Sequence, residues 1–344
     1  MKGARLRPLH FLLLALCFAA AGTLGRQWER LLAAPPHGRD LTREQAAGGD
    51  EEAGEEQEYT SHEKRTEKGT SQRIYRQGGV DKAQYSFVNF NKDNITVGFS
   101  MSGADLKAYL AGYGYTDTDL AKLKLRHDAA RTEAWNQAYK TGGKGAAEKA
   151  LAEADLDYDT KLRALLRARG MALRAGNVVE NDVPVIVKRN IKTLNPLALA
   201  FQKLATERRY QEEDTVGAVL SLVQTAIRYK VPPNVEGERH TCGLLPPARA
   251  LLCGWGDCDT KTALLGSILG SWSGIKMLGV AVPGHYLMAI RRLPGKGDLF
   301  VRYEGLEYVL VEPAGPAWLE PGMVGENTRG LLAGKQGYKL EPFF

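Results

Sequence analysis

The sequence predicts an α+β fold, in which packed helices are followed by a run of antiparallel strands. Helices are expected over Glu213–Arg228 and Thr260–Leu269. In the first, apolar residues recur every three or four positions, as one face of a helix requires. From Lys276 onward, short apolar runs alternate with turn dipeptides, which is typical of a sheet built from neighbouring strands. The predicted strands are 277–282, 286–290, 299–303 and 308–311.

Composition sets broad limits on the function. The chain has 344 residues, 44% of them hydrophobic, which is enough for one large or two modest domains with a sizeable core. The formal net charge of +6 is small for this length. The basic residues are scattered and do not alternate with aromatic ones, so the sequence predicts no nucleic-acid surface.

The N-terminus predicts export. Lys2, Arg5 and Arg7 precede the apolar stretch Phe11–Ala21, which ends in small residues. A basic flank, a short apolar core and small residues at its end are typical of a secretory signal peptide. Residues 1–25 are therefore predicted to be a signal peptide or an N-terminal anchor. The rest of the chain is expected in the periplasm or outside the cell, with an association with the inner membrane or cell envelope as an option.

Three further regions follow. Residues 26–75 are rich in polar residues and predict a disordered linker. Residues 76–195 predict a mainly helical region, with a β-hairpin over 85–90 and 95–99, a helical hairpin over 117–140 and 151–165, and an edge strand over 183–187. The helical hairpin is interpreted as a packing module, with a partner-binding arm as the alternative. Residues 196–344 carry the candidate chemistry.

Cys258 lies where a loop is expected to enter a helix, in the run Gly254-Trp255-Gly256-Asp257-Cys258-Asp259. A thiol at a helix N-terminus meets N–H groups without helical partners and the positive end of the helix dipole. Both favour the thiolate over the thiol, so the position predicts a nucleophile. Taken alone, Cys258 is also compatible with a structural role.

His285 and Glu312 complete a constellation with this thiol. His285 begins a predicted strand and Glu312 ends another. A nucleophilic thiol needs an adjacent base, and the base needs a carboxylate to orient it. A simple meander would insert the strand 299–303 between the other two. The triad therefore predicts that 286–290 and 308–311 pair directly, with 299–303 at an edge or in an excursion.

The residues around this triad resemble a known family. The segments G-D-C-D-T-K-T-A-L-L, P-G-H-Y-L-M-A-I and Y-V-L-V-E-P are similar to the bacterial branch of the transglutaminase-like superfamily, and so is the helical segment 223–229. The resemblance implies a papain-like core in residues 196–344, with Cys258, His285 and Glu312 as its triad. This chain departs from the family at the acid, where many members have Asp. Residues 26–195 are not explained by the resemblance.

The activity that the resemblance implies is acyl transfer through a thioester on Cys258, without a cofactor, on a protein or peptide substrate. Water as the acceptor gives a cysteine peptidase or amidase, which is the favoured interpretation, whereas a lysine amine gives a cross-linking transglutaminase. Two rival interpretations are a cell-wall amidase with a Cys-His dyad and a non-catalytic peptide- or envelope-binding module on the same fold.

The remaining candidate residues surround the nucleophile. The backbone N–H of Cys258 is expected to be one oxyanion donor, and the side chain of Gln224 or Trp255 a second, with a structural role for each as the alternative. Cys242 and Cys253 are predicted to form a disulfide after export. Zinc bound by His240 and the three cysteines Cys242, Cys253 and Cys258 is disfavoured, because the paired C-x-x-C spacing is missing.

Overall fold

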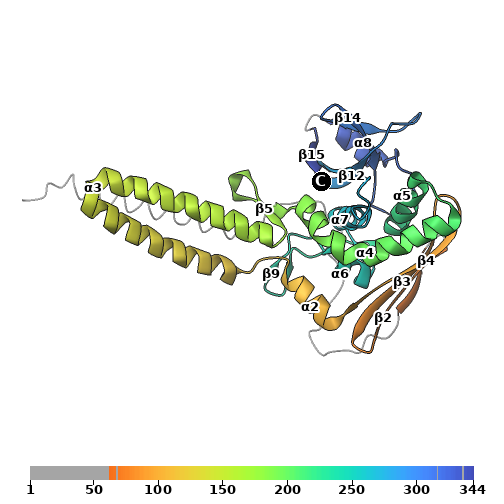
Figure 1. Cartoon of the computed structure of the whole chain (residues 1–344), viewed down its shortest axis with the longest axis horizontal. Helices are drawn as coiled ribbons and strands as arrows, with labels where there is room; N and C mark the ends of the chain where they lie inside the picture. The colour runs from red at the N-terminus through yellow and green to blue at the C-terminus, as the bar shows by residue number, and fades with distance from the viewer. Residues whose placement is uncertain (1–61, 67–68, 316, 335–336) are drawn as a thin grey trace, which may run out of the picture. The chain divides into compact units, whose positions relative to one another are not determined.

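The structure is a computed structural model that describes residues 62–66, 69–315, 317–334 and 337–344 (Figure 1). By its internal contacts, the chain groups residues 174–179, which contain the short helix η1 (Ala175–Asn177), apart from the other described residues. The unit described below comprises the residues before 174 and after 179. It combines helices with antiparallel sheets, so the predicted α+β class is confirmed.

A four-stranded antiparallel sheet opens the described chain. Its strands follow one another in sequence order: β1 (His62–Thr66), β2 (Thr70–Gln77), β3 (Val80–Val88) and β4 (Asn94–Ser102). The predicted hairpin is confirmed as β3 and β4. The predicted linker is wrong at its end, because β1 and most of β2 fall within it. Part of the buried face of β2 is polar, at Thr70 and Gln72, so hydrophobicity alone does not reveal the strand.

Gln72 connects this sheet to the segment that precedes the candidate nucleophile. Gln72 is 3% exposed. Its Nε2 donates to the Gly254 carbonyl at 2.8 Å and also to the Ala226 carbonyl. On β3, the Tyr85 hydroxyl donates to the Leu251 carbonyl. The sheet therefore supports the loop that leads to Cys258, which the sequence did not indicate.

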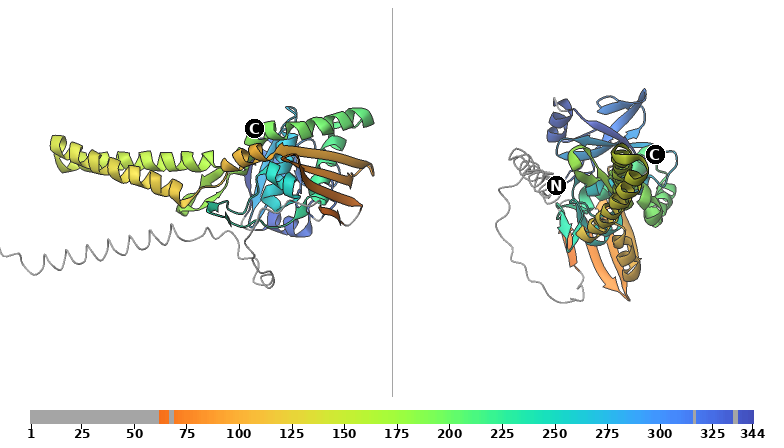
Figure 2. Two further views of the ribbon diagram at one scale, coloured as in Figure 1. Left: turned by 90° about the horizontal axis from the view of Figure 1, so that it is seen from below. Right: turned by 90° about the vertical axis from the view of Figure 1, so that its left-hand side faces the viewer.

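A helical hairpin follows the first sheet. After α2 (Gly103–Ala111), the long element α3 (Asp117–Ala168) is interrupted at Gly143, whose φ of 69° and ψ of −162° are not helical. Its two legs run side by side (Figures 1 and 2). His127 of the first leg stacks on Tyr158 of the second, with ring centroids 4.3 Å apart. The predicted helical hairpin is therefore confirmed.

The predicted edge strand at 183–187 is wrong, because these residues begin helix α4 (Val183–Arg208). The Asp182 carboxylate accepts the Val185 N–H at 3.1 Å and caps the helix. Pro184 lies in the first turn, where a missing N–H costs nothing. The cap at Asp182 and the proline after it therefore mark the start of a helix. Helix α4 also continues across residue 195, where the sequence predicted a domain boundary.

The predicted helix at 213–228 is shorter than expected. Helix α5 (Glu212–Ser221) passes into the π-helical turn η2 (Leu222–Ala226), and strand β7 (Arg228–Tyr229) follows. The Ile227 N–H donates to the Leu222 carbonyl five residues earlier, at 3.3 Å. Such π-turns occur often at functional sites, and this one contains Gln224.

The last part of the chain builds a five-stranded sheet that curls into a half-barrel. Its order is β13-β14-β12-β11-β15. β12 therefore pairs directly with β14, and β13 lies at an edge, as the sequence predicted. The C-terminal strand β15 was not expected. The elements are β11 (Met277–Val282), β12 (His285–Arg291), β13 (Phe300–Tyr303), β14 (Leu306–Val311) and β15 (Lys339–Pro342).

Shorter elements complete this unit. Strand β10 (Trp255–Gly256) pairs in parallel with β7 just before helix α7 (Cys258–Leu269). Helix α6 (Pro247–Cys253) precedes β10, and α8 (Glu326–Ala333) lies between β14 and β15 in sequence. The remaining short strands are β5 (Met171–Leu173), β6 (Val179–Asn181), β8 (Val235–Glu236) and β9 (Arg239–His240).

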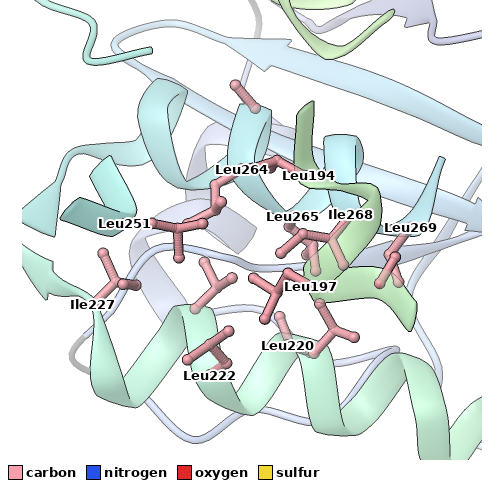
Figure 3. Close-up of a cluster of buried hydrophobic side chains, with 14 of the residues drawn as sticks. Leu194, Leu197, Leu220, Leu222, Ile227, Leu251, Leu264, Leu265, Ile268 and Leu269 are labelled. Atoms are coloured by element: carbon pink, nitrogen blue, oxygen red, sulfur yellow. The ribbon is translucent and has the colours of Figure 1, made fainter. Parts of the chain in front are cut away.

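Helix α7 lies in the middle of the main core and is buried along its whole length apart from Asp259. Its apolar side chains meet those of α4 and of the α5–η2 segment (Figure 3). The residues labelled there are Leu194, Leu197, Leu220, Leu222, Ile227, Leu251, Leu264, Leu265, Ile268 and Leu269. On the sheet, Tyr286 and Met288 of β12 belong to the same cluster. Because α7 is packed on every side, the position of its first residue, Cys258, is fixed by the core.

The predicted signal or anchor segment, residues 1–25, lies outside the described residues, as does the predicted linker up to residue 61. Among the helices that are described, none has the length and apolar character needed to cross a membrane.

Candidate active site

Cys258 is the first residue of α7. Asp257 caps the helix, and its Oδ1 accepts the Thr260 N–H at 3.1 Å. Gly256 allows this tight approach, because a Cβ there would lie 2.3 Å from Thr260 Cγ2. The thiol is fully buried, and its Sγ lies 3.3 Å from Asp259 Oδ1. The local sequence thus places the sulfur at the N-terminus of a helix, as predicted.

His285 begins β12, directly after a two-residue turn. Val282 and His285 face each other across the β11–β12 pair, with Pro283 and Gly284 between them. Gly284 has a φ of +71°, a conformation that favours glycine. The side chain of His285 is 13% exposed.

Glu312 follows the last residue of β14 and meets His285 directly. The β12–β14 register pairs Met288 with Val311 and Ala289 with Leu310. Continued by one step, it places Glu312 opposite Leu287. Glu312 is therefore diagonal to His285, which lies two residues before Leu287 on the same face of β12. His285 Nε2 lies 3.0 Å from Glu312 Oε1 and 3.1 Å from Oε2. This contact leaves Nδ1 as the ring nitrogen that can take a proton.

The Glu312 carboxylate is held by further donors. The Thr328 hydroxyl of α8 donates to Oε2 at 2.7 Å, and the Ala314 N–H donates to Oε1 at 3.3 Å. Glu312 is 4% exposed. These bonds fix its orientation toward the imidazole. Nothing in the sequence around Thr328 had indicated its role.

Helix α7 packs against β12, the strand that carries His285. One turn after Cys258, the Thr262 hydroxyl donates to the Tyr286 carbonyl at 3.2 Å. Tyr286 is the neighbour of His285 in β12. The N-terminal half of α7 therefore lies against the beginning of the strand that carries the imidazole.

Gln224 has a different role from the oxyanion donor that the sequence suggested. Its Nε2 donates to the Glu312 carbonyl at 2.7 Å and to the Leu319 carbonyl at 2.9 Å, which engages both hydrogens. Its Oε1 accepts the Leu319 N–H at 3.0 Å. The amide is committed to holding the segment after β14, and we assign it a positioning role. Trp255, the other oxyanion candidate, has Lys230 Nζ 4.7 Å from the centre of its ring, and its role in the oxyanion hole stays a prediction.

The predicted disulfide is not present: the structure does not join Cys242 to Cys253. The two thiols are held in different surroundings. Cys253 Sγ lies 3.7 Å from the Ala250 carbonyl within its own helix, whereas the Cys242 carbonyl accepts the Asn181 side-chain amide at 2.8 Å. Burial raises the pKa of both thiols, that of Cys242 to about 11.

The donor atoms of the disfavoured zinc set are not brought together with His240. His240 lies 3.0 Å from Asp117 Oδ1 and stacks on Tyr115, so its imidazole is engaged away from the disfavoured zinc set. Within the described part of the chain, the donors that lie within 4.8 Å of one another belong to the consecutive residues 257, 258 and 259. Their carboxylates already accept the Thr260 N–H and the Cys258 thiol.

Two cavities in the described part of the chain are lined by residues other than Cys258, His285 and Glu312. The larger, about 530 Å³, is lined by Val309 and Val311 of β14 together with Arg292 and several acidic residues. None of the three triad residues lines it. We therefore assign it no part in the chemistry.

The surroundings of Asp257 predict that the free energy of unfolding depends on pH. Burial, and then the charge of Asp259, raise the pKa of the Asp257 carboxyl from 3.8 to about 7. A raised acid pKa means that the folded protein holds this proton more tightly than the unfolded chain. The contribution of Asp257 to the free energy of unfolding is therefore fully present below about pH 4, and it is lost as the pH rises toward 7.

Asp257→Asn is accordingly expected to stabilise the protein at pH 8 and to have little effect at pH 4, because asparagine keeps the cap and carries no charge. The gain at pH 8 is on the order of 4 kcal/mol, since each pKa unit corresponds to about 1.4 kcal/mol. Urea unfolding at the two pH values measures it, with Asp105→Asn in the exposed first turn of α2 as the control. An equal effect at both pH values would contradict this assignment.

Comparisons with known proteins give no match: no family model, no curated protein and no solved structure is similar to the chain. The functional conclusion therefore depends on the geometry of the site and on the motifs that carry it.

Proposed function

We propose that the protein is a thiol-dependent acyl-transfer enzyme, with Cys258 as nucleophile, His285 as base and Glu312 as the residue that orients the imidazole. The observation that carries the proposal is the contact of His285 Nε2 with both carboxylate oxygens of Glu312, at 3.0 and 3.1 Å. It leaves Nδ1 available for the thiol proton. A base that is oriented in this way is the requirement of a thiol nucleophile.

The reaction proceeds through two transfers. His285 Nδ1 takes the Cys258 proton, the sulfur attacks an amide carbonyl, and the protonated imidazole then gives the proton to the leaving amine. Water, deprotonated by the same nitrogen, cleaves the thioester and releases the acid. We propose the backbone N–H of Cys258, at the start of α7, as one donor to the oxyanion. Glu312 holds the orientation of the imidazole in each step.

The fold that we propose for this region is the papain-like, transglutaminase-like core. The arrangement that supports it is a nucleophile helix, α7, packed on an antiparallel sheet in which the strands of His285 and Glu312 are neighbours. The triad works without a cofactor. We propose an exported enzyme that acts on protein or peptide amides by hydrolysis, since water is the abundant acceptor. Cross-linking to a lysine amine is the alternative outcome of the same thioester.

The test is the pH dependence of Cys258 alkylation by iodoacetamide in the full-length protein, followed by mass spectrometry of each cysteine peptide. Cys242 and Cys253 serve as internal controls, because burial raises their pKa. We expect Cys258 to react at pH 6 at least about tenfold faster than either control, and His285→Ala to abolish the difference.

The pH profile of an ordinary thiol for Cys258, the same in the wild-type protein and in His285→Ala, would refute the enzymatic proposal and favour a binding module on the same fold. Because Cys258 is fully buried, the same measurement shows whether a small reagent reaches the thiol in solution. Products of a labelled peptide library, free acid or amine conjugate, then separate hydrolysis from cross-linking.

A further inference from the structure

Lys261 is a buried cation that the proposed mechanism does not use. It is 0% exposed, and its Nζ has no hydrogen-bond partner among the described residues. Burial of an ammonium without a partner is unfavourable, because water no longer solvates the charge. An apolar residue would fill the same space at a lower cost. The amine therefore calls for a functional explanation.

The position of Lys261 connects it to the thiol site. It lies three residues after Cys258 in α7, so the two side chains share one face of the helix. Its backbone N–H donates to the Asp257 carbonyl at 2.9 Å in the first turn. Glu312, the carboxylate that holds His285, is the charge that acts on its amine. Lys261 thus shares a face of α7 with the nucleophile, and its amine feels the charge of the proposed acid.

The surrounding groups define the electrostatics of this amine. From β12, the Tyr286 carbonyl accepts the Thr262 hydroxyl of α7 at 3.2 Å, and the Tyr286 hydroxyl donates to Glu341 Oε2 at 2.8 Å. On α7 itself and at its cap, the acidic groups are Asp257 and Asp259. Burial lowers the pKa of Lys261 from 10.5 to about 7, and the charge of Glu312 opposes this shift. The amine therefore changes its charge close to neutral pH.

We infer that Lys261 is a positioning residue of the thiol site, whose buried amine acts on Glu312 and sets how readily the Cys258–His285 pair ionises. The inference rests on the proposed function and deepens it. An ammonium one helical turn from Cys258 stabilises the thiolate, because opposite charges attract strongly in a poorly solvated site. A neutral amine gives no such support. The ammonium thus widens, toward acidic pH, the range in which the nucleophile is active.

The test compares the pH profile of Cys258 alkylation, from pH 5 to 9, in the full-length wild-type protein and in Lys261→Met. Methionine fills the same space without a charge. We expect the acidic limb of the profile to move up by about half to one pH unit, which is a three- to tenfold loss of rate at pH 6. Lys261→Arg, which keeps the positive charge, is expected to retain the wild-type limb. Lys192→Met, an exposed lysine of α4, is the matched control and leaves the profile unchanged.

A structural role alone would give a different result. If Lys261→Met melts at a higher temperature but has the wild-type pH profile, the lysine is only a destabilising core residue and the inference is overturned. Should Lys261→Arg fail to fold because of its larger head group, the Lys261→Met profile still decides.

The failure of this inference is distinguishable from the failure of the proposed function. An activated Cys258 that depends on His285 but is indifferent to Lys261→Met overturns the inference alone. An ordinary thiol profile in the wild-type protein, unaffected by His285→Ala, overturns both.

Discussion

Glu312→Gln is expected to slow the alkylation of Cys258 at pH 6 by about tenfold to a hundredfold and to leave the fold intact. Glutamine is nearly the same size, so its Oε1 can still accept from the Thr328 hydroxyl or from the Ala314 N–H. The change removes the negative charge 3.0 Å from His285 Nε2. Without this carboxylate the imidazole loses the group that orients it toward the thiol proton, so the thiol is activated less often.

The effect on turnover is expected to be larger, about 10³ to 10⁴, because an amide can present its N–H₂ group to Nε2 and hold the imidazole in the wrong tautomer. Glu307→Gln is the matched control. Glu307 lies within β14, and its Oε1 accepts from Arg302 Nη2 at 3.1 Å on the solvent side of the sheet edge. Glu312→Gln with wild-type labelling at pH 6 would show that the His285 contact is structural only.

The sequence predicted the strands of the candidate site well because their signals are local. Pro283 and Gly284 define the turn before His285, and Asp257 has the side chain of a helix cap next to Cys258. The direct pairing of β12 with β14 followed from a chemical requirement, that the base and the acid meet, and the observed register agrees. Periodicity alone would have given a meander with β13 in the middle.

The parts that the sequence did not predict depend on contacts between distant residues. Gln72 lies in a polar stretch that resembles a linker, and only the tertiary structure shows its bond to the Gly254 carbonyl, 182 positions away. Thr328 and Lys261 have no motif that marks them as neighbours of Glu312. The run 183–187 has the β-branched composition of a strand, but the cap at Asp182 and the proline after it favour a helix.

Gln224→Leu is expected to reduce the stability by about 2 to 4 kcal/mol and to slow Cys258 alkylation at pH 6 together with it. Leucine fills the same space but removes three hydrogen bonds, to the Glu312 carbonyl and to both backbone groups of Leu319. Each buried group that is left unsatisfied costs about 1 to 3 kcal/mol, and the half-buried Leu319 can recover part of this from water. The segment after β14 then loosens, and Glu312 loses its position against the imidazole.

Urea unfolding and the alkylation rate at pH 6 measure the two effects, with Gln202→Leu on the exposed face of α4 as the control. Gln224→Glu is not expected to rescue either property, because a carboxylate keeps the acceptor for the Leu319 N–H and lacks both donors.

The pair of measurements also separates the positioning role of Gln224 from the oxyanion role. Alkylation of a thiol by iodoacetamide forms no tetrahedral oxyanion. The loss of an oxyanion donor would therefore leave the alkylation rate and the stability unchanged, and it would lower only the turnover of an amide substrate. A joint loss of stability and labelling therefore identifies Gln224 as the residue that holds Glu312 in place.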